Sequence, residues 1–179
     1  MACDTGRMRV ERTFAFVDLC GFTQFTNTDG DEHAVDVLTR FRGAARAIGS
    51  EHGVRVAKWL GDGAMFVSTA REPLVESILA LARRAEDDVR LPLRGGLAGG
   101  AVILFEGDDY IGAPVNLAAR LCDVAQPREL LAAASLADAV PGWAAAISGA
   151  PRDISGFTAA VEVVRIQSSN PVSVSGGGH

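Results

Sequence analysis

The segment Gly61-Asp62-Gly63 constrains the fold most, because it joins two apolar stretches by a very short connection. Asp-Gly is a strong signal for a tight hairpin turn, so Arg55–Leu60 and Ala64–Ser68 are predicted to be neighbouring antiparallel strands. The flanking sequence has the apolar run of one buried strand and the periodicity of two amphipathic helices. These three elements are expected at Arg12–Leu19, Glu32–His52 and Glu72–Asp88.

The second half of the chain predicts four further elements. They are a strand interrupted by glycines, a helix, a short strand and a final alternating strand, at Leu93–Leu104, Gly112–Ala125, Glu129–Ala134 and Ala159–Ile166. Strand–helix–strand units around a central hairpin predict an α+β fold of the ferredoxin-like kind. We expect an antiparallel sheet with helices on one face and additions at the C-terminal end, so the bare face needs a partner.

The length of 179 residues and the composition, 48% hydrophobic and 22% charged, are ordinary for one globular domain. We expect one folded unit, at residues 12–167. Residues 1–11 are polar and basic and are expected to be a flexible N-terminus. Residues 168–179 are rich in Ser and Gly and resemble a flexible tail or a remnant of cloning.

Charge and cysteine usage exclude several classes of function. The net charge of −5 and the lack of a basic tract argue against nucleic-acid binding. The three cysteines form no Cys-x-x-Cys pair and the three histidines have no zinc-ligand spacing, which predicts reduced thiols and a cytoplasmic protein. No apolar run approaches the roughly 20 residues that span a bilayer, so we expect no membrane segment in this chain.

Two aspartates are the first candidates for chemistry. Asp18 ends the apolar run Phe14–Val17, and Asp62 lies in the hairpin turn. Adjacent strands lie about 4.8 Å apart, so these carboxylates can converge on Mg²⁺ or Mn²⁺ bound to a nucleoside triphosphate. For either residue alone a plainer interpretation stays open, with Asp62 as a turn residue and Asp18 as a helix cap.

A second group of polar residues follows in the chain. Asn116 and Arg120 are four residues apart on one predicted helix, so they share a face and could donate to ribose and phosphate oxygens. Asp109 precedes that helix. Lys58, four residues before Asp62, is the single lysine among seventeen basic side chains. A solvated helix face is the alternative interpretation of Asn116 and Arg120.

Three segments together resemble the signatures of the class III nucleotidyl cyclase catalytic domain, of the adenylyl cyclase type. They occur in the family's order and are Phe16-Val17-Asp18-Leu19-Cys20-Gly21-Phe22-Thr23, Lys58-Trp59-Leu60-Gly61-Asp62-Gly63 and Asp109-Tyr110-Ile111-Gly112 through Val115-Asn116-Leu117-Ala118-Ala119-Arg120. The resemblance implies an adenylate cyclase that converts ATP to 3′,5′-cyclic AMP and pyrophosphate. It also implies a head-to-tail homodimer with two active sites at the interface.

The resemblance further implies a role for each matching residue. Asp18 and Asp62 would bind two divalent cations, and the amides around Gly21, Phe22 and Thr23 would hold the phosphates. From the partner chain, Lys58 and Asp109 would recognise the base, Asn116 would orient the ribose and Arg120 would stabilise charge at the α-phosphate. A lysine and a carboxylate match the acceptor N1 and donor N6 of adenine, whereas guanine presents the reverse pattern.

The sequence departs from the family in two places. Many relatives have a lysine before the last strand to hold the terminal phosphates, where this chain has Ser155. Many also have an arginine before the Asp-Tyr turn, where this chain has Phe105-Glu106-Gly107-Asp108. Arg94 or Arg152 could compensate. Two alternatives therefore stay open, a weakly active or silent nucleotide-binding and dimerisation module and, less consistent with the motifs, a phosphoacceptor domain built on Asp18.

Overall fold

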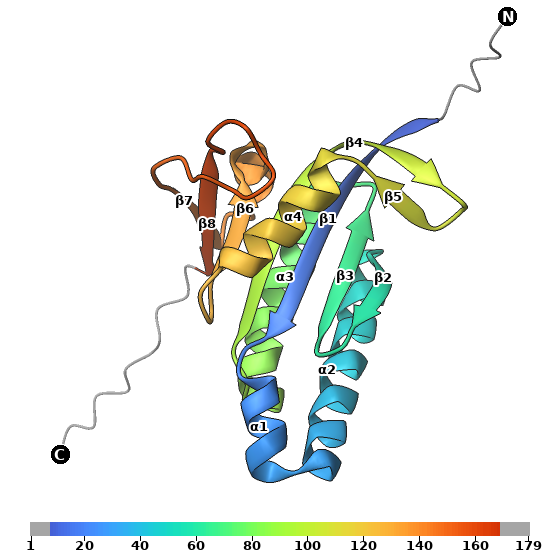
Figure 1. Cartoon of the computed structure of the whole chain (residues 1–179), viewed down its shortest axis with the longest axis vertical. Coiled ribbons are helices and arrows are strands. Elements are labelled where there is room, and N and C mark those ends of the chain that lie inside the picture. Colours follow the sequence, from blue (N-terminus) through green and yellow to red (C-terminus); the bar gives the residue numbers. More distant parts are fainter. Residues whose placement is uncertain (1–7, 169–179) are drawn as a thin grey trace, which may run out of the picture.

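The computed structural model describes residues 8–168, which form one twisted sheet with helices packed against it (Figure 1). The strand order in the described part is β2-β3-β1-β4-β6-β8-β7, and β5 pairs with β4. The strands are β1 (Arg9–Leu19), β2 (Arg55–Leu60), β3 (Gly63–Ser68), β4 (Leu93–Phe105), β5 (Asp109–Ile111), β6 (Leu130–Ala133), β7 (Ala144–Ser148) and β8 (Val163–Ser168). The helices are α1 (Phe22–Asp29), α2 (Asp31–His52), α3 (Arg71–Arg84) and α4 (Ala113–Val124), with a π-helical turn η1 (Ala85–Val89) and a 3₁₀-helix η2 (Ala134–Ala139).

Most predicted elements lie where expected, with small shifts at their ends. Strand β1 begins at Arg9 instead of Arg12, because its first residues pair with the far end of β4. The predicted helix Glu72–Asp88 is α3 continued by η1, and the last strand starts at Val163 instead of Ala159. The ends expected to be flexible, 1–11 and 168–179, lie outside the described residues at 1–7 and 169–179, whereas β1 already begins at Arg9 and β8 ends at Ser168.

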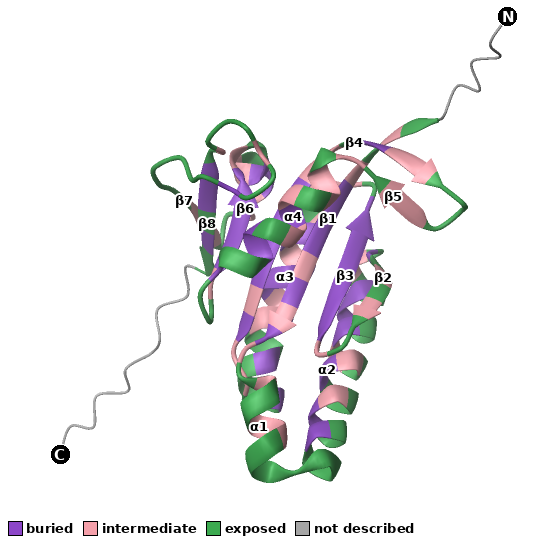
Figure 2. Cartoon of the chain, in the orientation of Figure 1, coloured by how far each residue is buried: buried purple, intermediate pink, exposed green. Residues whose placement is uncertain are grey.

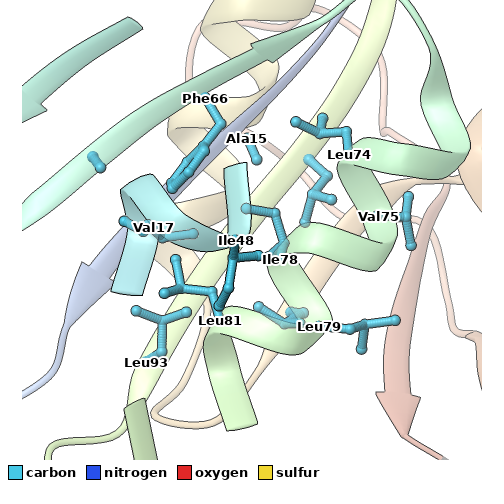
Figure 3. Packing of buried hydrophobic residues seen from close by; sticks show 14 of the residues in the cluster. Ala15, Val17, Ile48, Phe66, Leu74, Val75, Ile78, Leu79, Leu81 and Leu93 are labelled. Carbon is cyan, nitrogen blue, oxygen red and sulfur yellow. The ribbon is translucent and has the colours of Figure 1, made fainter. Parts of the chain in front are cut away.

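The main core lies between the sheet and helices α2 and α3. Alternate residues in the second half of β1 enter it, namely Ala15, Val17 and Leu19, as the alternation of a strand requires. Figure 3 shows Ile78 and Leu81 of α3 on the same side of the sheet as Val17. In Figure 2 the central strands are largely buried, and the helices are buried on the side that faces the sheet and exposed on their outer side. The predicted α+β fold is thus confirmed, with α2 and α3 packed together on one face of the sheet.

Helix α4 lies on the opposite face of the sheet, which the prediction did not anticipate. Figure 1 shows it crossing in front of β1 and β4, while α2 and α3 lie behind. Ala118 packs in a second core cluster with Phe14 and Ala98, which point away from the main core. Gly96 permits this close approach, because a Cβ there would lie 2.2 Å from the Ala118 carbonyl oxygen.

The C-terminal strands extend the sheet beyond β4, as predicted, but they make it mixed. Strand β6 is parallel to β4, whereas β8 and β7 continue the sheet in antiparallel pairs. Four described elements have no counterpart in the predicted order: α1, β5, η2 and β7. Helix α1 and strand β5 lie next to predicted site residues, because α1 begins shortly after Asp18, at Phe22, and β5 begins with Asp109.

Candidate active site

Asp18 and Asp62 are neighbours at one end of the sheet. Asp18 is paired with Gly63, and the backbone N–H of Leu19 donates to the Asp62 carbonyl oxygen at 3.3 Å. Gly63 is required for this arrangement, because a Cβ at that position would lie 2.5 Å from the Val17 carbonyl oxygen and 3.3 Å from the Asp18 Oδ1. The hairpin turn therefore places Asp62 beside the end of β1, as the sequence predicted.

A cavity of about 380 Å³ opens at this edge. It contains both aspartates and the whole segment from Cys20 to Thr23, so all five residues predicted to hold metal and phosphate border one space. The other residues lining it come from β4 and from the C-terminal end of α4: Arg94, Asp123, Ala125, Gln126 and Pro127, together with Leu19 of β1.

Burial and the charge of Asp18 make the cavity an unfavourable place for the negative charge of Asp62. Burial raises the pKa of Asp62, and the nearby Asp18 carboxylate raises it further. Burial also raises the pKa of the Cys20 thiol, which keeps that thiol neutral. Two carboxylates that repel each other in a partly buried site are suited to a multivalent cation, which removes the repulsion.

The N-terminus of α1 forms another side of the cavity. Gly21, with φ of 78°, turns the chain directly from β1 into the helix, and the N–H of Phe25 donates to its carbonyl oxygen at 2.9 Å. The first N–H groups of a helix have no partner within the helix and attract anions. No acidic residue lies in the first turn, so the amides at Phe22 and Thr23 are suited to phosphate oxygens.

Arg94 is the cation of the cavity. Its Nε and Nη2 atoms donate to the Asp18 Oδ2 at 3.2 and 3.0 Å, and its Nη1 donates to the Asp123 carbonyl oxygen at 3.1 Å. Of the two arginines considered as substitutes for the missing basic residues, Arg94 lines the cavity and Arg152 does not. Arg152 instead forms an ion pair with Glu129 at 3.7 Å. Ser155 is likewise outside the cavity lining.

Lys58 and Asp109 meet in an ion pair between β2 and β5. A β-bulge between Val56 and Lys58 makes this contact possible, because it turns Lys58 to the face of the sheet on which α4 lies. Arg55 faces the same side and holds the hairpin of β4 and β5, with hydrogen bonds to Asp108 at 3.0 Å and to the Tyr110 hydroxyl at 3.2 Å. These two partners flank Asp109, so Arg55 fixes its position.

Asn116 and Arg120 lie on the exposed side of α4. Arg120 contacts Asp123 at 3.3 Å across one helical turn. Neither residue lines the cavity with Asp18, and neither Lys58 nor Asp109 does. The structure of one chain therefore brings the predicted metal and phosphate residues together, but leaves the predicted base, ribose and charge-stabilising residues in separate, solvent-accessible places.

Asp18 and Asp62 are the pair of carboxylates in the cavity that could hold a metal. Residues 8–168 contain no group of three or more His, Cys, Asp or Glu side chains able to bind a metal ion by themselves. Oxygen ligands from a bound nucleotide would have to complete the coordination of Mg²⁺ or Mn²⁺, which keeps part of its shell open to phosphates and water. Two hard carboxylates in a cavity beside a helix N-terminus suited to phosphate oxygens fit that chemistry.

Comparisons with known proteins point to one family, although no family model matches the chain. An uncharacterised protein of Mycobacterium tuberculosis is 42% identical over 151 residues, 82% of this chain and 38% of that protein. A protein of the same species described as a pH-sensitive adenylate cyclase is 33% identical over 172 residues, 92% of this chain and 43% of that protein. The chain spans about two fifths of the length of these curated relatives.

Solved structures share the fold. The adenylyl cyclase CyaB from P. aeruginosa superimposes with a TM-score of 0.81 at 22% identity, over 91% of this chain and 96% of that chain. The guanylate cyclase domain of RhGC from Catenaria anguillulae, solved with GTP, gives a TM-score of 0.79 at 17% identity, over 90% and 98% of the two chains. In residues 8–168, no helix combines the length and apolar character needed to span a membrane.

Proposed function

Because the chain belongs to the class III nucleotidyl cyclase catalytic domains, in sequence and in fold, we propose that it converts ATP to 3′,5′-cyclic AMP and pyrophosphate. The observation that supports this most strongly is the cavity that unites Asp18, Asp62 and the N-terminus of α1. A site with two cation ligands beside a phosphate-binding helix end is suited to a metal-bound triphosphate.

Asp18 and Asp62 would hold two divalent cations, Mg²⁺ or Mn²⁺. When bound, the cations would lower the pKa of the ribose 3′-hydroxyl and neutralise the triphosphate. The chain's own residues align the reaction: the amides of Phe22 and Thr23 bind phosphate oxygens and fix the α-phosphorus for in-line attack by the 3′-hydroxyl. Pyrophosphate leaves, and no covalent bond to the protein forms.

The site is completed by a second copy of the chain in a head-to-tail homodimer. The support is geometric, because Lys58, Asp109, Asn116 and Arg120 are solvent-accessible and line no part of the cavity that holds the aspartates. In the dimer Asn116 orients the ribose, and Arg120 stabilises the negative charge that grows at the α-phosphate. Arg120 must then leave its contact with Asp123, which is an exposed ion pair and worth little by itself.

Lys58 and Asp109 select the base. Their ion pair places one donor and one acceptor side by side, which matches the N1 and N6 atoms of adenine. Guanine, with an acceptor at O6 and a donor at N1, would leave polar groups mispaired, at a cost of about 1–3 kcal/mol for each one that is buried. ATP is therefore the proposed substrate, in preference to GTP.

Arg94 replaces the basic residues that the sequence lacks at Ser155 and before Asp109. It lines the cavity together with the proposed phosphate-binding helix end and pairs with Asp18, whereas Arg152 is outside the cavity lining and pairs with Glu129. With cations held at Asp18, the Arg94 guanidinium would be free to leave that carboxylate and contact the terminal phosphates. A guanidinium suits this role because it can donate two parallel hydrogen bonds to phosphate oxygens.

The test is an assay of the purified chain with ATP or GTP, with Mg²⁺ or Mn²⁺ and with a chelator. We expect metal-dependent formation of cyclic AMP in clear excess over cyclic GMP. Nucleotide binding without any cyclic product would support the alternative of a silent nucleotide-binding module. Cyclic GMP as the main product would refute the assignment of Lys58 and Asp109 to adenine.

A further inference from the structure

The hairpin turn that carries Asp62 is held from two sides. From β1, the N–H of Leu19 donates to the Asp62 carbonyl oxygen at 3.3 Å. From α2, the Nη2 of Arg42 donates to the Gly61 carbonyl oxygen at 3.1 Å. The two carbonyl groups belong to the peptide bonds before and after Asp62, so both flanking peptides are fixed. The contact from β1 is part of the sheet edge, whereas the contact from α2 depends on a single side chain.

The Arg42 guanidinium is placed by the ring of Trp59. Its carbon Cζ lies 5.0 Å from the centre of the ring, which is within range of a cation–π interaction. The Trp59 ring also packs edge to face with Phe41, a fully buried residue of α2, with the ring centres 6.5 Å apart. Residues of one helix therefore hold both Trp59 at the end of β2 and the turn that follows it.

One nitrogen atom of the Arg42 side chain is in an unfavourable environment. Its Nε atom is buried without a hydrogen-bond partner, and it is the one buried side-chain nitrogen or oxygen in that condition among residues 8–168. An unpaired buried donor is disfavoured and calls for an explanation other than the stability of the side chain. The contact with the Gly61 carbonyl oxygen, next to a proposed metal ligand, supplies one.

We propose that Arg42 is a positioning residue for the metal-binding turn. Its hydrogen bond fixes the Gly61–Asp62 peptide and thereby keeps the Asp62 carboxylate close enough to Asp18 to share divalent cations. Without that bond the turn can rotate at Gly61, which has a positive φ of 65° and no side chain to restrict it. The proposal rests on the proposed function, because it assumes that Asp62 binds the metal.

Arg46 provides a matched control on the same helix face. Its Cζ lies 5.1 Å from the centre of the Trp59 ring, so it makes the same kind of stacking contact as Arg42. In the described part of the chain Arg46 makes no hydrogen bond to the turn, since Arg42 is the donor to Gly61. Replacing either arginine by glutamine removes one charge and one contact with Trp59, but only Arg42→Gln removes the bond to the turn.

The experiment measures Mn²⁺ binding to the full chain by electron paramagnetic resonance in the presence of 3′-deoxy-ATP, which lacks the attacking hydroxyl. Since residues that orient metal ligands typically contribute 10–100-fold to affinity, Arg42→Gln should need about 10-fold more Mn²⁺ for half-saturation, whereas Arg46→Gln should stay within about twofold of wild type. Excess Mn²⁺ should restore much of the cyclase activity of Arg42→Gln. If that variant does not fold, Arg42→Lys, which keeps the charge over Trp59, replaces it and should also bind Mn²⁺ more weakly than Arg46→Gln.

Equal Mn²⁺ affinity in wild type and the Arg42 variant would overturn the role of Arg42 while leaving the proposed function intact. Equal weakening by Arg42→Gln and Arg46→Gln would also overturn it, because the cause would then be the packing of Trp59. A wild-type chain that binds no Mn²⁺ in the presence of nucleotide would instead refute the metal site, and with it both proposals.

Discussion

Replacing Asp62 by asparagine should abolish activity and yet stabilise the metal-free protein. Asparagine keeps the shape of the side chain but removes a charge that the cavity disfavours through burial and through repulsion by Asp18. Loss of a metal ligand should lower kcat by at least about 10²-fold, because charge stabilisation in the transition state is lost. That factor corresponds to at least about 2.7 kcal/mol in activation free energy.

The gain in stability should be small and should depend on pH. Asp62 is partly exposed, so solvent screening limits the gain to less than about 1 kcal/mol, which is at most about 2–4 °C in Tm for a domain of this size. The raised pKa means that the folded protein binds this proton more tightly than the unfolded chain does. Wild type therefore loses stability as pH rises through the pKa of Asp62, and the advantage of the asparagine variant is largest at neutral pH.

The assay is a thermal melt of both proteins from acid to neutral pH, with chelator and then with Mn²⁺ and 3′-deoxy-ATP. In chelator the variant should melt at or above the wild-type temperature, and the difference should shrink as pH falls. Metal with nucleotide should raise the Tm of wild type more than that of the variant. A variant that melts well below wild type without metal, or that keeps near-normal activity, would refute this account of Asp62.

Three further variants test other parts of the molecule. Lys58→Glu combined with Asp109→Cys should collapse ATP use and raise the ratio of cyclic GMP to cyclic AMP; an unchanged ratio with activity retained would remove both residues from base recognition. Arg94→Ala should raise the KM for ATP by about tenfold, which corresponds to the loss of one charge-assisted contact of about 1.4 kcal/mol. A KM within error of the wild-type value would exclude contact between Arg94 and the phosphates. Gly96→Val should prevent α4 from packing on β4 and lower the Tm by more than about 5 °C, on the order of the loss from severe overpacking. A wild-type melting curve would contradict the close approach of α4 to Gly96.

The parts of the fold that the sequence predicted are those with regular apolar patterns. The hairpin Arg55–Ser68 was placed correctly because its turn chemistry and its two apolar runs agree. Helix α1 was not predicted, since Phe22–Asp29 is short, contains no fully buried residue and contacts the main core through Phe22 and Phe25. The position of α4 on the opposite face was equally hidden, because an amphipathic pattern shows that a helix is half buried but not which face of a sheet it covers.

In the candidate site, too, residues near a recognisable local pattern could be predicted, whereas contacts between distant elements could not. Asp18 and Asp62 could be placed together from the sequence, because a strand end and a neighbouring turn are close in any antiparallel arrangement. The contact of Arg94 with Asp18 depends on the register between two strands 76 residues apart. The contact of Arg42 with Gly61 depends on how α2 packs beside β2. Side chains that hold a site from distant elements leave no local pattern in the sequence.

The central claim is that one chain supplies the metal ligands and a second supplies the residues that act on the ribose and the α-phosphate. It is tested most directly by mixing the Asp62→Ala and Arg120→Ala variants, each inactive alone, and measuring cyclic AMP. A heterodimer would contain one intact site and one doubly damaged site, so the mixture should recover part of the wild-type rate. Failure to recover any activity, in a sample in which heterodimers are demonstrated, would mean that each chain carries its own complete site.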